Sequence, residues 1–144
     1  MATPEEADAI IVRLQAPFEQ RPTTFESMFH SGSLEFSDEV IGHVRDLAKH
    51  APTIVDVYAD RPAILGPIVE VAAAVTINWG ASAEALLDVL TGRFAPQGRL
   101  PFDLPRSMAA VEAARPDVPF DTADPLFRFG HGITELGALG RQNG

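Results

Sequence analysis

The stretch T-I-V-D-V-Y-A, from Thr53 to Ala59, decides the fold class of this chain. Isoleucine, valine and tyrosine are strong strand formers. The run begins directly after Pro52 and ends at the turn residues Asp60 to Pro62. A short apolar run bounded in this way is typical of a strand in the interior of a sheet.

Two further runs predict strands on either side of this one in the sequence. Within Asp8 to Leu14, four consecutive apolar residues begin at Ala9, and we expect this strand to be buried on both faces. The run from Ala72 to Asn78 predicts a third strand, which ends at Trp79 and Gly80.

Helices are predicted between and after these strands. Ser37 is a good N-cap, and the residues behind it are apolar at helical spacing until Pro52 ends the segment. Ser82 caps a second helix, for which Gly92 provides the C-terminal stop. A shorter helix is expected within Ala63 to Val71, where a proline interrupts the pattern.

The order of these elements is strand, helix, strand, helix, strand, helix. Short crossovers between apolar strands require parallel pairing with right-handed connections. The sequence therefore predicts an α/β fold, a three-layer αβα sandwich around a mostly parallel open sheet. With 144 residues, we expect a single domain over 1–144.

The composition excludes several classes of partner. Lys+Arg 11 against Asp+Glu 20 gives a net charge of -9, whereas nucleic acids and anionic membranes require a basic surface. No apolar run approaches the roughly 20 residues of a membrane span. The N-terminus does not resemble a signal peptide, so we expect a cytoplasmic location if the chain is complete.

Ligands of open parallel sheets bind beyond the carboxyl ends of the strands. Three connections qualify here, Gln15 to Phe36, Asp60 to Pro62 and Trp79 to Ser82. The first is the longest, and long irregular connections are often functional. It holds most of the ionisable candidates, which are Glu19, Arg21, Glu26 and His30.

Other site templates are missing from the sequence. The first predicted strand is followed by L-Q-A-P-F-E-Q and not by the glycine-rich G-x-G-x-x-G loop, which counts against a flavodoxin-like or nucleotide-binding domain. There is no G-x-S-x-G nucleophile elbow. The chain has no cysteine, and its four histidines are scattered, so we expect neither a metal site nor a cofactor.

The C-terminal half carries motifs of a known family. These are G-R-L-P-F-D-L-P, Gly98 to Pro105, D-P-L-F-R-F-G-H-G-I, Asp124 to Ile133, and the helix and turn from Ala85 to Gly98. Together with D-R-P at Asp60 to Pro62, they resemble the C-terminal α/β sandwich domain of family 3 glycoside hydrolases of the β-glucosidase type. The resemblance covers roughly Ala7 to Thr134.

The resemblance implies a retaining mechanism with two carboxyl groups. In that family, an aspartate nucleophile lies on a preceding (β/α)8-barrel domain, and a loop of the second domain often supplies a general acid/base. The segment A-P-F-E-Q-R, Ala16 to Arg21, resembles that loop, so Glu19 is the candidate acid/base, with Glu26 in reserve. Arg21 and Trp79 are the candidate substrate-binding residues.

The resemblance also implies a truncated domain, because the family's second domain begins with further strands. We therefore expect a missing barrel partner, a β-linked oligosaccharide or glycoside as substrate, little turnover by this chain alone, and possible homo-oligomerisation through an exposed sheet edge. The alternative is a non-catalytic carbohydrate-binding or scaffold module, for which every loop carboxylate would be dispensable.

Overall fold

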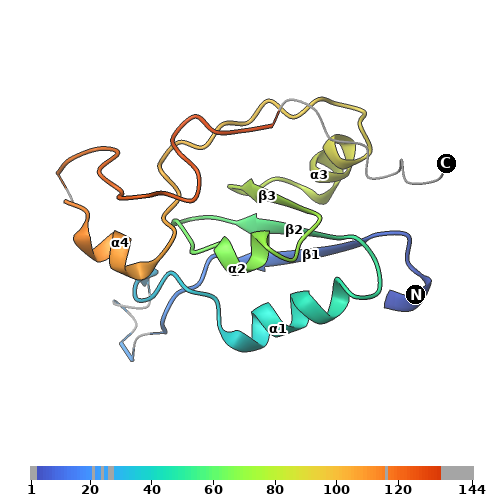
Figure 1. Ribbon diagram of the computed structural model, residues 1–144, viewed down its shortest axis with the longest axis horizontal. Coiled ribbons are helices and arrows are strands. Elements are labelled where there is room, and N and C mark those ends of the chain that lie inside the picture. The colour runs from blue at the N-terminus through green and yellow to red at the C-terminus, as the bar shows by residue number, and fades with distance from the viewer. Residues whose placement is uncertain (1–2, 21, 24, 26–27, 116, 134–144) are drawn as a thin grey trace.

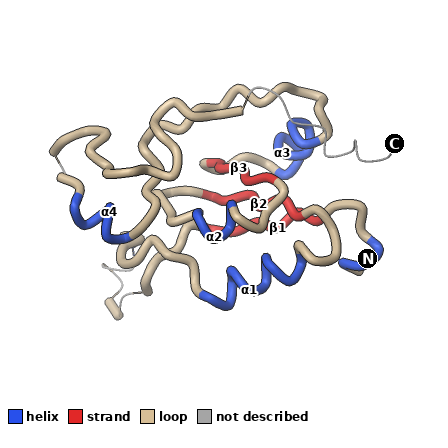
Figure 2. Tube along the Cα trace, viewed as in Figure 1, coloured by secondary structure: helices blue, strands red, loops and turns tan. Residues whose placement is uncertain are grey.

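We describe the protein from a computed structural model that describes residues 3–20, 22–23, 25, 28–115 and 117–133. Three strands and four α-helices alternate along most of the chain (Figures 1 and 2). In chain order they are β1 Ile10–Gln15, α1 Asp38–Leu47, β2 Thr53–Tyr58, α2 Gly66–Val69, β3 Ala74–Asn78, α3 Ala83–Leu90 and α4 Met108–Ala113, preceded by a short 3-10 helix at Pro4–Glu6.

The strands form one parallel sheet in the order β1-β2-β3. The register is continuous across it, since Val12 pairs with Val55, and Val55 with Val75. β2 is the central strand, and its residues Thr53 to Val57 are all buried. The predicted α/β class and open parallel sheet are therefore confirmed.

One face of the sheet carries the main core. Val55 and Val57 are completely buried there, beside Val44 of α1 and Ile68 of α2. The segment between α3 and α4 adds two leucines to this core cluster, Leu100 and Leu104. Burial of a side chain of this size stabilises a fold by about 1.5–3 kcal/mol, so this face accounts for much of the stability.

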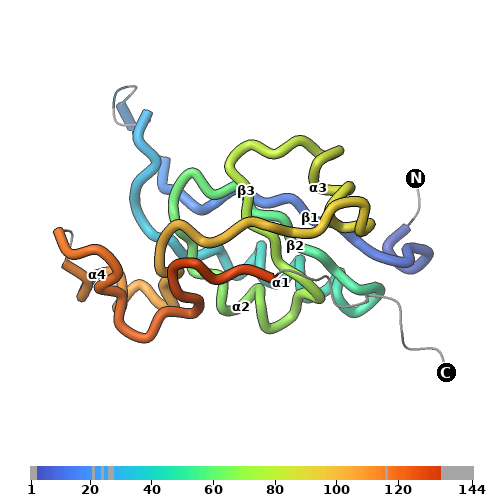
Figure 3. The backbone as a smooth tube through the Cα atoms, turned by 90° about the horizontal axis from the view of Figure 1, so that it is seen from above, coloured from blue at the N-terminus to red at the C-terminus, as the bar shows by residue number. Residues whose placement is uncertain are grey.

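The opposite face of the sheet is polar at its centre and lies under α3. Figure 3 shows α1 and α2 on one side of the sheet and α3 on the other, as the three-layer prediction requires. Asp56 of β2 is only 1% exposed and binds side chains of both neighbouring strands, Arg13 and Thr76. Leu86 is the buried residue of α3.

The two edges of the sheet differ. Beyond β3, the chain runs through Leu100 and Leu104, which bond to the backbone of His131 and Phe127 (Figure 1). Within the described residues, β1 has a strand partner on one side only. The prediction that β1 is buried on both faces is wrong: its residues alternate in burial, and Ile11 is 40% exposed.

The predicted helix starts are confirmed, with one change of bounds. The hydroxyls of Ser37 and Ser82 accept hydrogen bonds from the backbone of Val40 and Ala85. The helix expected within Ala63 to Val71 is only the single turn Gly66–Val69. Its proline lies in the first turn, where no backbone N–H is needed, so the proline starts this helix and does not interrupt it. No helix in the described part of the chain is long and apolar enough to cross a membrane.

Candidate active site

The carboxyl ends of the three parallel strands meet at one end of the sheet, and the candidate residues follow them. The long loop after β1 carries Glu19 and His30. The turn after β2 begins with Asp60 and Arg61, and Trp79 directly follows β3. This end is where open parallel sheets bind ligands.

Glu19 lies where the long loop folds back on itself. Its backbone N–H donates to the carbonyl of Ser31 over 2.8 Å, which makes an isolated antiparallel bridge. Its carboxylate Oε1 accepts from the backbone N–H of Ser33 over 3.1 Å. Gly32 between them has φ +88°, a conformation that side chains rarely tolerate. The side chain of Glu19 is exposed but held by the loop itself.

The turn after β2 is joined to this loop by two side chains. Arg61 donates from Nη2 to the carbonyl oxygen of Gly32 over 2.8 Å. Asp60 Oδ2 contacts His30 Nδ1, and the imidazole stacks on Phe18 with ring centroids 3.9 Å apart and planes 11° apart. Phe18 and His30 are thus fixed to one another, and His30 is fixed to the end of β2.

Two of the four predicted site residues cannot be placed. Arg21 and Glu26 lie outside the described residues, so the predictions for them stay predictions. In the same stretch of sequence, the described residues Phe25, Met28 and Phe29 are strongly exposed, by 72%, 75% and 61%. A cluster of exposed large apolar side chains on one loop is typical of an interaction surface.

Trp79 stands on a fixed turn. Asn78 Oδ1 accepts hydrogen bonds from the backbone N–H groups of Gly80 and Ala81, at 2.9 and 3.1 Å. The indole is 53% exposed and packs edge-on against Phe102. Because β2 lies between β1 and β3, Trp79 and Glu19 follow strands that are roughly 10 Å apart.

The carboxyl end of the sheet carries two described carboxylates, Glu19 and Asp60. The Glu19 carboxylate accepts from the backbone N–H of Ser33, and the Asp60 carboxylate contacts the imidazole of His30. Among the described residues, no group of three or more His, Asp or Glu side chains is placed to hold a metal ion. Glu19 is exposed, and an exposed carboxyl group can exchange a proton with a ligand.

The pairing of His30 with Asp60 is the site feature that sequence reasoning missed. The two residues are 30 positions apart, and no periodic pattern links them. A usable signal exists nonetheless, because Asp60 and Arg61 directly follow the buried central strand. Charged residues at that position of a parallel sheet face the same end as the loop after β1.

Gly32→Ala should displace the Glu19 side chain. A Cβ at Gly32 would collide with the Glu19 side-chain atoms, and the backbone there has φ +88°. Gly80→Ala is the matched control, since its φ is +105° but nothing lies within 4 Å of the added Cβ. Both variants should lose about 1–2 kcal/mol of stability from backbone strain. Only Gly32→Ala should shift the NMR signals of the Glu19 side chain, and equal signals in both variants would contradict this placement.

The chain matches the family described as glycosyl hydrolase family 3 C-terminal domain over residues 1–135. It is 50% identical over 132 residues to a probable beta-glucosidase C of Aspergillus flavus, covering 92% of this chain and 21% of the relative. It is 50% identical to beta-glucosidase C of Emericella nidulans over 131 residues, covering 91% and 21%. The periplasmic beta-glucosidase/beta-xylosidase of Dickeya chrysanthemi is 44% identical over 136 residues, covering 91% and 21%.

Solved structures agree on the fold. A beta-glucosidase from Listeria innocua in complex with isofagomine superposes with a TM-score of 0.65 at 15% identity, covering 88% of this chain and 20% of that one. Beta-glucosidase D2-BGL from Chaetomella raphigera gives a TM-score of 0.65 at 23% identity, covering 90% and 21%. The chain spans about a fifth of the length of the curated relatives it matches. It belongs to the glycosyl hydrolase family 3 C-terminal domain family.

Proposed function

We propose that this chain completes the active site of a β-glucosidase-like enzyme by supplying its acid/base loop, with Glu19 as the proton donor. Retaining glycosidases need two carboxyl groups about 5–5.5 Å apart, one as nucleophile and one as acid/base. The described end of the sheet offers Glu19 as the candidate acid/base. The nucleophile would come from a catalytic domain in the part of the relatives that this chain does not cover.

The observation that carries this proposal is the placement of Glu19. It lies at the carboxyl end of a parallel strand, on a loop fixed by backbone and side-chain contacts, with its carboxylate exposed. A proton donor must be held in one geometry and must still reach its ligand. The substrate we propose is a terminal β-linked sugar, with Arg21 and Trp79 as binding residues and Glu26 as the reserve acid.

One contact favours a second function, a non-catalytic sugar-binding or scaffold module. The Glu19 carboxylate accepts a hydrogen bond from Ser33 of its own loop, as a residue with a structural role would. In that case the loop would retain its shape only with Glu19 present, but catalysis would not depend on its proton. Substitution of the carboxylate by its amide separates the two functions, because the amide oxygen can still accept from Ser33.

Among the residues that the structure describes, no strand pairs with the outer edge of β1, which supports our proposal that the chain associates through this strand. Exposed edge strands are templates for pairing with another strand. In a full-length protein the partner would be part of the same enzyme, and in the isolated chain it would be a second copy. Light scattering should then show a dimer, and replacing the exposed Ile11 by lysine should return a monomer.

The proposed function is tested by grafting. A chimera would carry this chain in place of the matched 131 residues of the Emericella nidulans beta-glucosidase C. We expect no hydrolysis of an aryl β-glucoside by the isolated chain and clear hydrolysis by the chimera. Turnover by the isolated chain would show a complete catalytic pair within these residues, and would contradict the proposal. A folded but inactive chimera would favour the scaffold function.

A further inference from the structure

The loop after β1 folds back so that Phe18 and Glu19 contact residues His30 to Ser33. We call these two contacting segments the Glu19 hairpin. On one side, Glu19 bonds to Ser31 through the backbone, and its carboxylate reaches Ser33. On the other, Phe18 lies flat against the His30 ring. These contacts fix the position of Glu19 relative to His30. They do not attach the hairpin to the sheet.

Attachment to the sheet comes from the turn after β2. Ala59 is buried and bonds through its N–H to the carbonyl of Asn78 over 2.8 Å, so the start of this turn is anchored between strands. From there Asp60 reaches His30, and Arg61 reaches the carbonyl oxygen of Gly32. Both contacts fall on the strand of the hairpin opposite Glu19.

The third attachment is at Leu34, which directly follows the hairpin in the sequence. The N–H of Ile64 donates to the carbonyl of Leu34 over 2.8 Å, and both residues are buried. This bond holds the loop after the hairpin whether or not Asp60 and Arg61 are present. Loss of the side-chain contacts should therefore release the hairpin without unfolding the core.

We propose that Asp60 and His30 are positioning residues, which together with Arg61 hold the Glu19 hairpin at the end of β2. In this arrangement Asp60 orients the imidazole through Nδ1, in the way that carboxylates fix histidine rings elsewhere. Phe18, stacked on the same ring, carries that orientation to the residue next to Glu19. We call the contacts of Asp60, His30 and Arg61 the clamp. Its catalytic role rests on the proposed function, but the contacts themselves belong to this chain.

A residue that only stabilises the fold would behave differently from a clamp. The side chains of His30 and Asp60 are 31% and 24% exposed, and pairs at such exposure contribute little to global stability. A clamp acts locally, since loops open independently of the core. The difference is visible in which backbone amides lose protection.

The test is amide hydrogen exchange by NMR on this chain, with Asp60→Ala, His30→Ala and the double variant. We expect the amides of Glu19 and Ser33 to exchange at least about tenfold faster in each single variant, with little further increase in the double variant. Amides of β2 should not change. Asp46→Ala, which removes an exposed ion pair between Asp46 of α1 and Lys49 just beyond the helix, is the control and should change none of these amides.

In the grafted enzyme, Asp60→Ala should lower kcat/KM more for an alkyl β-glucoside than for a dinitrophenyl β-glucoside, because displacing the acid affects only the leaving group that needs a proton. Asp60→Asn should restore most of the rate, because its oxygen can still accept from His30. Unchanged exchange at Glu19 and Ser33, or an equal increase throughout β2, would overturn the clamp. Faster exchange together with full activity of Glu19→Gln would leave the clamp standing and reject the proposed function.

Discussion

Glu19→Gln in the grafted enzyme should lose activity in proportion to the need of the leaving group for a proton. For an alkyl β-glucoside, we expect kcat/KM to fall by about 10²–10⁴, the usual contribution of a general acid. A dinitrophenol leaves without protonation, so kcat/KM for its β-glucoside should fall less than about tenfold. Its kcat should fall strongly, because the second step of a retaining mechanism also needs the base.

The measurement is a comparison of steady-state rates on the two substrates. Glu35→Gln is the matched control, since Glu35 is an exposed glutamate of the same loop whose backbone N–H bonds to the Ser33 hydroxyl. This control should change neither substrate's kcat/KM by more than about twofold, because surface substitutions usually have small effects. Equal losses on the two substrates in Glu19→Gln would point to a folding or binding role for Glu19.

Asp56→Ala should cause the largest loss of stability in the described part of the chain. Asp56 lies on the polar face of the central strand and is only 1% exposed. Its carboxylate accepts hydrogen bonds from Arg13 at 2.9 Å, Thr76 at 2.7 Å and Asn78 at 3.0 Å. Removing one partner of such a buried network costs about 3–5 kcal/mol, because the donors lose their acceptor.

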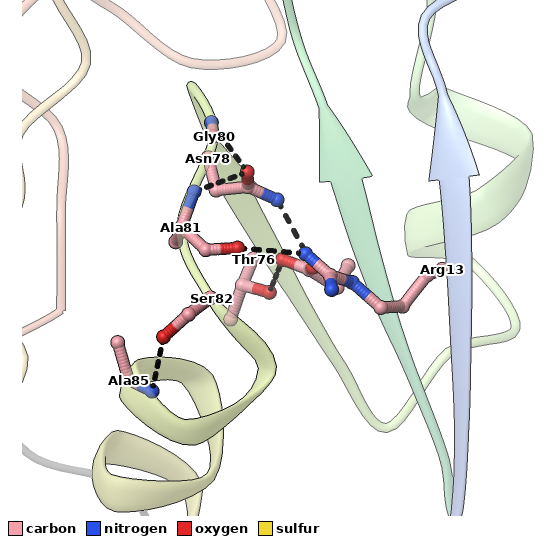
Figure 4. A network of polar contacts seen from close by, with 8 residues as sticks. Arg13, Thr76, Asn78, Gly80, Ala81, Ser82 and Ala85 are labelled. Carbon is pink, nitrogen blue, oxygen red and sulfur yellow. Dashed lines mark hydrogen bonds and ion pairs between the residues drawn. The ribbon is translucent and has the colours of Figure 1, made fainter.

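The network also fixes the start of α3. Arg13 donates from Nη2 to the carbonyl of Ala81, and Asn78 Oδ1 accepts from Gly80 and Ala81 (Figure 4). Loss of Asp56 therefore releases side chains that hold the turn after β3. Total stabilities of single domains are about 5–15 kcal/mol, so this variant should be close to unfolding at 37 °C.

Urea denaturation of the isolated chain measures this prediction. Asp46→Ala removes an exposed carboxylate whose ion pair with Lys49 spans 2.6 Å, and this change should leave the urea midpoint almost unchanged because water screens exposed pairs. The urea midpoint of Asp56→Ala should fall well below that of the control. A difference of less than about 1 kcal/mol between the two variants would show that the network contributes little.

The elements with strong local signals could be predicted from the sequence. β2 is a continuous apolar run, and it is the buried central strand. Ser37 and Ser82 could be predicted as N-caps because a serine hydroxyl accepts a hydrogen bond from a free backbone N–H in the first turn of a helix. The exposure of β1 could not be predicted in this way. An apolar run shows what a strand tolerates, whereas burial depends on which elements lie beside it in space.

The candidate site shows the same division. The position of the loop after β1 follows from the sequence, because loops at strand ends are local features, whereas the choice of Glu19 within it stays a prediction. The contacts that hold Glu19 could not be derived, since Asp60 and Arg61 reach residues about 30 positions away. Such contacts depend on the register of two strands and on the backbone path through Gly32.

The most direct test of the central claim is to trap the glycosyl-enzyme intermediate with azide. Glu19→Gln of the grafted enzyme would be given a dinitrophenyl β-glucoside and azide, which needs no general base to attack. The account predicts a restored rate and a β-glycosyl azide, because a separate nucleophile forms the intermediate and azide displaces it with a second inversion. An α-glycosyl azide would show that Glu19 is itself the nucleophile. If Glu19→Gln hydrolyses the substrate as fast as the unsubstituted grafted enzyme and forms no glycosyl azide, Glu19 takes no part in the chemistry. Either of these two results would contradict the proposed role of Glu19.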